Sequence, residues 1–196
     1  MQRSKKHYSS SRSRGNINKL MNRFILYLFG FLLLAQANAL ACNFKIVDFG
    51  SPKENIKLDN NLPEPLLMPD RFGGENLVIP LEQICKSNNK LYGTQLIYLY
   101  IENKLSRIQL YRPIMPDRNL MDFAMEKYGS FNLPKGLPKE KWRGNHVWDL
   151  NLELVEYIVT DIHDGHVEII DIVNKLYLPT IENYNEKVGE WLDSGQ

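Results

Sequence analysis

The chain has 196 residues and a formal net charge of +1, with 24 Lys and Arg residues against 23 Asp and Glu residues. Seven of the basic residues and none of the acidic ones lie in the first 41 positions, so residues 42–196 hold 17 basic and 23 acidic residues and carry a net charge of −6. The phosphate backbone of a nucleic acid is bound by clustered Lys and Arg side chains. Nucleic acid is therefore excluded as a partner of this acidic segment.

Residues 1–41 have the three parts of a secretory signal: a basic segment, an apolar run and a stretch of small residues. The apolar run, Phe24–Ala35, is short for a membrane-spanning helix, which needs about 20 residues. Small residues in the pattern A-x-A then predict cleavage after Ala39 or after Ala41. Cleavage makes the remainder periplasmic or secreted, whereas a retained signal would anchor the chain in the membrane.

Within this region, residues 21–41 suffice as a signal peptide, because Met21 stands directly before a short basic and apolar segment. Residues 1–20 are then either a mis-assigned start or a disordered tail. Residues 42–196 number about 155, which is the size of one domain. We expect them to form a single exported domain.

Cys42 and Cys85 are the only cysteines of the chain, and both follow the signal region. An isolated pair of cysteines in an oxidising compartment usually forms a disulfide. The alternative is that Cys42 is lipidated, because Ala39–Cys42 is similar to a bacterial lipobox, although Ala39 stands where that motif has leucine. Lipidation would attach the chain to a membrane and leave Cys85 unpaired.

The first predicted elements are a strand over residues 44–49, where apolar residues alternate, and a short helix that begins at Ser51–Glu54 with a capping-box pattern. Residues 59–76 are rich in proline and glycine and are predicted to form a loop. Residues 95–111 contain two β-rich runs separated by Glu102–Lys104. This pattern predicts a hairpin.

A helix is predicted next, with Asp117 or Asn119 as its N-cap and Tyr128 in its last turn. Gly129 stands where a glycine with positive φ commonly ends a helix. The proline-rich and glycine-containing residues 132–141 then predict a loop.

Residues 142–150 contain Arg143–Asn145, which we interpret as a tight turn. Residues 154–162 and 167–173 flank Asp164-Gly165, a dipeptide typical of a type I′ hairpin turn. They are predicted to be paired strands, although the second run is also compatible with a helix.

The last predicted element is a helix capped by Thr180. One of its stripes is apolar and contains Ile181, Tyr184, Val188 and Trp191. Together these elements predict an α+β fold of one domain. We expect two layers, with an antiparallel sheet of hairpins packed on one face against two or three helices.

A candidate metal site lies at the second hairpin. If Asp164-Gly165 is a two-residue turn, His163 faces His166 and Asp161 faces Glu168. Two imidazoles and two carboxylates on one face could bind Zn²⁺ or Cu²⁺, or could respond to pH. The alternative is an ordinary solvated hairpin tip that binds no ligand.

A candidate partner-binding face lies on the first hairpin. With a two-residue turn, Tyr98 faces Arg107, and both share a face with Tyr100 and Tyr111. Tyr and Arg are favoured at protein interfaces. The alternative is that another segment of the chain covers this face, and a longer turn would change which residues share it.

Two tryptophans, Trp142 and Trp148, lie near several basic residues. They could bind a sugar or an anion through stacking and cation–π contacts. The alternative is that both are anchors of the core.

The motifs G-x-S-x-G, H-E-x-x-H and C-x-x-C and the phosphate-binding loop are absent from the sequence, so no enzymatic activity is supported. No cofactor is expected. We predict a non-catalytic module that binds another extracytoplasmic protein, as an inhibitor or an immunity-type protein does, and its acidity suits a basic partner surface. The alternatives are a metal-binding protein that uses the hairpin tip and a structural component of the cell envelope.

Overall fold

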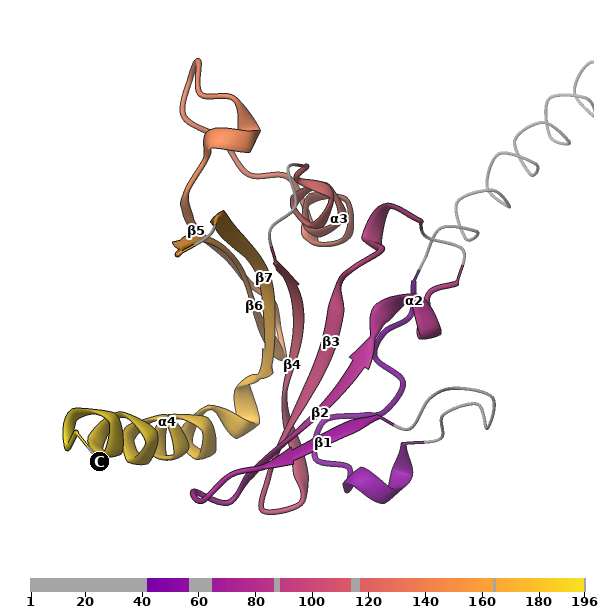
Figure 1. Ribbon diagram of the computed structural model, residues 1–196. Coiled ribbons are helices and arrows are strands. Elements are labelled where there is room, and N and C mark those ends of the chain that lie inside the picture. Colours follow the sequence, from indigo (N-terminus) through magenta and orange to yellow (C-terminus); the bar gives the residue numbers. More distant parts are fainter. Residues whose placement is uncertain (1–41, 57–64, 87–88, 114–116, 164, 196) are drawn as a thin grey trace, which may run out of the picture. The chain divides into compact units, whose positions relative to one another are not determined.

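The computed structural model describes residues 42–56, 65–86, 89–113, 117–163 and 165–195 (Figure 1). Three sequence predictions lie wholly or partly outside these residues. They are the signal region 1–41, residues 59–64 of the predicted loop at 59–76, and Asp164 of the second hairpin.

Seven antiparallel strands form one sheet in the described residues, and strands that pair in it are consecutive in the chain except for β4 and β7. Their spatial order is β1-β2-β3-β4-β7-β6-β5. The strands in this order are Leu66–Pro69, Gly74–Pro80, Gln95–Ile101, Lys104–Pro113, Gly165–Asn174, Glu153–Ile162 and Gly144–Asp149.

Two longer helices and one short helix accompany the sheet in the described part of the chain. These are α2 (Leu81–Ile84), α3 (Asn119–Tyr128) and α4 (Leu178–Asp193). Short 3₁₀ turns are η1 (Lys53–Asn55), η2 (Asn89–Leu91), η3 (Lys139–Lys141) and η4 (Lys175–Tyr177). The predicted α+β class and the antiparallel sheet are confirmed.

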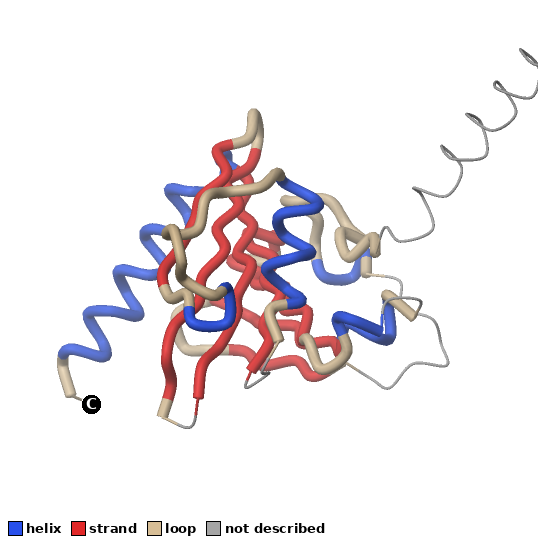
Figure 2. Tube along the Cα trace, turned by 90° about the horizontal axis from the view of Figure 1, so that it is seen from above, coloured by secondary structure: helices blue, strands red, loops and turns tan. Residues whose placement is uncertain are grey.

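The two faces of the sheet are covered differently. The inner face is defined here as the one that packs against α3 and residues 42–49, and the outer face as the one that α4 touches. Figure 2 shows α3 and α4 on opposite sides of the strands. The expectation that the helices share one face is therefore wrong, because Leu99 and Ile101 alternate outward from β3 and bury Ile181 of α4.

The inner face carries the main core. Side chains from six strands form one buried cluster with those of α3 there, and most have almost no exposed surface. They include Leu77, Leu96, Tyr98, Leu110, Tyr157 and Ile170 of the sheet and Leu120, Met121 and Ala124 of α3.

Several predicted boundaries match the structure. The turn between β3 and β4 is of type I′, because Glu102 and Asn103 both have positive φ, at 52° and 58°. Gly129 follows α3 with a φ of 110°, as predicted, whereas the N-cap is Arg118 instead of Asp117 or Asn119, and Asp117 accepts a hydrogen bond from the main-chain N–H of Asn119. The paired runs 154–162 and 167–173 lie in strands β6 and β7.

Other predictions need correction. Residues 44–49 are irregular rather than a strand, although Phe44 is buried. The predicted loop at 59–76 contains strand β1 and the start of β2, because the edge position of β1 tolerates its terminal Pro69. The predicted turn Arg143–Asn145 is the start of β5, and the last helix begins at Leu178, before Thr180.

Cys42 and Cys85 form a disulfide, with 5.1 Å between their Cα atoms. Both cysteines belong to the inner core, so the bond ties residues 42–49 to the end of α2. The same segment is also held through Tyr98, whose buried hydroxyl donates a hydrogen bond to the carbonyl oxygen of Phe44. The predicted pairing of the two cysteines is confirmed.

Removing this disulfide tests its contribution to stability. The bond spans a sequence separation of 43 residues. We expect the double substitution Cys42→Ala and Cys85→Ala to lower the free energy of unfolding by about 4 kcal/mol, chiefly because the unfolded chain gains conformational entropy. Urea unfolding with and without reductant measures this. A reductant should destabilise the wild type and leave the double variant unchanged.

Candidate functional site

The structure separates the residues of the predicted metal site. Strand register places Asp161 opposite His166 and Glu168 opposite Val159, while His163 lies in the turn. The turn therefore comes one residue earlier than predicted, and this shift changes every facing pair. Glu168 is buried in the core with 1% exposure. No group of three or more potential metal ligands occurs among the residues that the structure describes.

The predicted partner-binding face is also divided. A register shift between Leu99 and Tyr100 places Tyr98 opposite Ile108 instead of Arg107. Tyr98 and Tyr100 are buried in the inner core, with 0% and 1% exposure. Arg107 and Tyr111 lie on the outer face, where they are partly exposed. The two tyrosines are thus covered by other segments of the chain, as the alternative interpretation expects.

The segment that connects α3 to β5 extends away from the sheet, as Figure 1 shows in orange at the top. We call residues 130–143 the projecting loop. Its tip is a tight turn in which the N–H of Leu137 donates to the carbonyl of Pro134 at 3.1 Å, and Gly136 has a φ of 80°. Pro138 follows the turn directly, and proline restricts the main chain. Leu137 is 36% exposed, so an apolar side chain stands on a constrained turn.

A buried arginine holds the base of the projecting loop. Arg118, at the start of α3, has 0% exposure. Its Nη2 donates to the carbonyl of Glu140 at 2.7 Å and its Nε donates to the carbonyl of Lys139 at 3.3 Å. A guanidinium is charged at all relevant pH values, and hydrogen bonds from charged donors are stronger than neutral ones. These contacts therefore restrict the motion of the loop relative to α3.

Two ion pairs and a group of rings add to this attachment. Lys139 pairs with Asp122 of α3 at 2.6 Å, and Arg143 pairs with Asp161 of β6 at 2.6 Å. Aromatic rings from the loop and the strands stack beneath it, with Phe131 and His146 parallel at a centroid distance of 4.4 Å. The other rings of this group are Trp142, Trp148 and Tyr157. Trp142 and Trp148 are 7% and 8% exposed, as the interpretation of core anchors requires.

Glu168 connects this anchor to the sheet. Its Oε1 accepts hydrogen bonds from the Tyr157 hydroxyl at 2.5 Å and from the main-chain N–H of Met121 in the first turn of α3 at 3.3 Å. Burial raises the pKa of Glu168 above its ordinary value, although Tyr157, Arg118 and Arg112 each stabilise the carboxylate. The same burial raises the pKa of the Tyr157 hydroxyl. A charged network inside the inner core thus fixes the start of α3.

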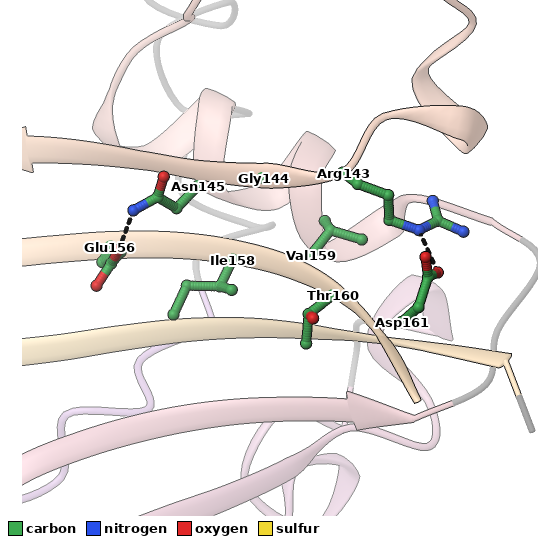
Figure 3. A pocket seen from close by; sticks show the side chains of 8 residues that line it. All are labelled: Arg143, Gly144, Asn145, Glu156, Ile158, Val159, Thr160 and Asp161. Carbon is green, nitrogen blue, oxygen red and sulfur yellow. Dashed lines mark hydrogen bonds and ion pairs between the residues drawn. The ribbon is translucent and has the colours of Figure 1, made fainter. Parts of the chain in front are cut away.

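An open groove of about 570 Å³ lies at the foot of the projecting loop, along β5 and β6. Figure 3 shows the Arg143–Asp161 pair at one end and, at the other, Asn145, which donates to Glu156 at 2.5 Å. The remaining lining residues are Gly144, Ile158, Val159 and Thr160. The groove is thus lined by one ion pair, one amide–carboxylate hydrogen bond and apolar side chains.

The sequence indicated the loop at 132–141 and its basic surroundings. It gave no sign of the role of Arg118, and it placed Glu168 in a candidate metal site rather than in a buried network. Both are charged residues that are buried in the main core. A charged residue at a position of a strand or helix cap that is expected to be buried is only a weak indication of an internal polar network. No local sequence pattern links Arg118 to its hydrogen-bond acceptors, because they lie far from it in the chain.

Comparison of the chain with protein-family models, with curated proteins and with solved structures finds no match. In the described part of the chain, no helix is both long enough and apolar enough to cross a membrane.

The role of the Arg118 anchor can be measured directly. In Arg118→Met the carbonyls of Lys139 and Glu140 lose a charged donor, and we expect the free energy of unfolding to fall by about 2–3 kcal/mol. Amide hydrogen exchange in the projecting loop should become faster. Lys139→Gln is the matched control, because it removes one charge from the same loop but only a solvent-exposed ion pair, which contributes about 0–1 kcal/mol. Equal exchange rates in both variants would contradict the anchoring role.

Glu168 should make stability depend on pH. Because its pKa is higher in the folded protein than its ordinary value of 4.5, the folded state retains a proton that the unfolded chain releases, and stability falls as pH rises through that interval. We expect Glu168→Gln to gain stability relative to the wild type across the same interval, since the amide carries no charge. Urea unfolding from about pH 4 to about pH 8 measures the difference.

The control for this titration is Glu190→Gln on the exposed side of α4. It removes an equal charge from the surface and is measured over the same pH range. A Glu168→Gln curve that runs parallel to the wild-type curve would show that Glu168 does not retain the proton.

Proposed function

We propose that the exported chain is a non-catalytic protein-binding module, of the inhibitor or immunity type, that contacts its partner with the projecting loop. The observation that carries the proposal is that the fully buried guanidinium of Arg118 holds the base of the loop on which the exposed turn stands. A loop that is rigid before binding loses less conformational entropy on association. Leu137 at its tip supplies an apolar contact.

The location that this function requires is periplasmic or extracellular. The Cys42–Cys85 disulfide supports it, because such bonds persist mainly in oxidising compartments. The basic and apolar sequence of residues 1–41 supports it as well.

Charge favours a partner with basic regions. Residues 42–196 carry a net charge of −6, and exposed acidic residues follow one another along α4. Opposite charges on two proteins accelerate their association, and like charges slow it. Association should therefore slow as ionic strength rises.

A photo-crosslinking residue at position 137 tests the proposal in cells. We expect replacement of Leu137 with benzoylphenylalanine to yield one dominant protein adduct after illumination, because the tip lies within the interface. Leu66→benzoylphenylalanine is the matched control, since Leu66 is 60% exposed but lies in β1, at the opposite edge of the sheet from β5. Mass spectrometry identifies the adduct.

Affinity for the identified partner provides the second measurement. We expect Leu137→Asp to weaken binding at least about tenfold, or about 1.4 kcal/mol, while Leu66→Asp leaves it unchanged. If positions 137 and 66 give the same adducts, or Leu137→Asp binds as the wild type does, the projecting loop is not the contact surface.

A further inference from the structure

We infer that the free edge of β5 binds an extended segment of a partner protein, which joins the sheet as an additional antiparallel strand. The inference rests on the proposed function, in that it names how the partner's main chain is recognised beside the projecting loop.

Hydrogen-bond alternation fixes which main-chain groups of β5 point away from the sheet. The N–H of Leu150 donates to the carbonyl of Glu153 at 2.9 Å, so this pair is a hydrogen-bonded pair of the β5–β6 ladder. Hydrogen-bonded and non-bonded pairs alternate in an antiparallel ladder. The N–H and C=O groups of Asn145, Val147 and Asp149 therefore point outward from the edge.

These outward groups are accessible. All three residues are exposed, and Val147 is 48% exposed although it is apolar. No residue in the described ranges accepts a hydrogen bond from the N–H groups of Asn145, Val147 or Asp149. An edge with successive unpaired donors and acceptors is a template for an added strand.

The opposite edge of the sheet lacks this property. At β1 the N–H of Asp70 donates to the carbonyl of Gly74, and the same alternation turns Leu67 and Pro69 outward. Because proline has no N–H, Leu67 alone offers an outward donor in β1. The strand is also only four residues long. Prolines and short length are the common protection of an edge strand, and β5 has no proline.

The surroundings of β5 indicate the chemistry of the partner segment. The side chains of Asn145, Val147 and Asp149 lie on the outer face, where Val147 is opposite Glu156. Asp149 is 72% exposed even though it pairs with Lys175. A partner residue opposite Val147 is therefore apolar or β-branched, and the residue two positions away, opposite Asp149, is Lys or Arg.

The position of the edge also fits the proposed contact surface. The projecting loop runs through Arg143 directly into β5, and the groove of about 570 Å³ lies along the same strands (Figure 3). One extended segment can thus pair with β5 and place its side chains in the groove while the loop contacts the body of the partner.

Selection from a library of phage-displayed random peptides on the purified, processed protein tests the inference without knowledge of the partner. We expect enriched peptides in which an apolar β-branched residue and a Lys or Arg are two positions apart. On binding such a peptide, the amide protons of Asn145, Val147 and Asp149 should exchange more slowly, because each becomes hydrogen-bonded. This measurement uses the wild-type chain and does not depend on the folding of a variant.

The matched variants are Val147→Pro and Leu67→Pro. Each removes an outward N–H from one edge strand, and neither removes a hydrogen bond within the sheet. Val147→Pro should weaken peptide binding at least tenfold and Leu67→Pro should not, with thermal unfolding confirming that both are folded.

Two outcomes would overturn the inference: no peptide enriched above a selection without the protein, or enriched peptides that leave the β5 amide exchange unchanged. If position 137 gives a partner adduct and β5 binds no peptide, only this inference fails. If β5 binds peptides and position 137 gives no adduct, only the role of the loop fails.

Discussion

The guanidinium group of Arg118 connects the inner core to the projecting loop. It has no exposed surface, and its hydrogen bonds end on carbonyls of the projecting loop. A buried charge is tolerated only with partners, and here these are the loop carbonyls and the nearby carboxylate of Glu168. The buried charge of Arg118 is thus hydrogen-bonded to the loop only when the loop occupies this position.

The same network determines where α3 lies. Glu168 accepts a hydrogen bond from the first turn of α3, which places a carboxylate at a helix N-terminus, where negative charge is favourable. Tyr157 of β6 donates a hydrogen bond to the same carboxylate, and the disulfide holds residues 42–49 against the inner core. The loop, α3 and the edge strand β5 therefore form one continuous region whose parts are fixed by buried polar contacts as well as by apolar packing.

Local sequence predicted the elements whose ends are chemically marked. The hairpin around Glu102–Lys104, the end of α3 at Gly129 and the Cys42–Cys85 pair all follow from short patterns with a direct physical cause. The prediction failed at residues 66–76, where proline and glycine belong to an edge hairpin rather than to a loop. The predicted facing pairs at both candidate sites were also wrong, because a shift of one residue in register changes every later pair.

By itself the sequence determined an acidic segment with one cysteine pair, an α+β composition and the loop between α3 and β5, since charge, redox chemistry and turn preferences are properties of short stretches. Only the tertiary structure decided that Arg118 is the anchor of that loop, that Glu168 is buried, and that β5 is an edge with free main-chain groups. These features depend on strand order and register, which arise from packing between residues far apart in the chain and leave no local pattern.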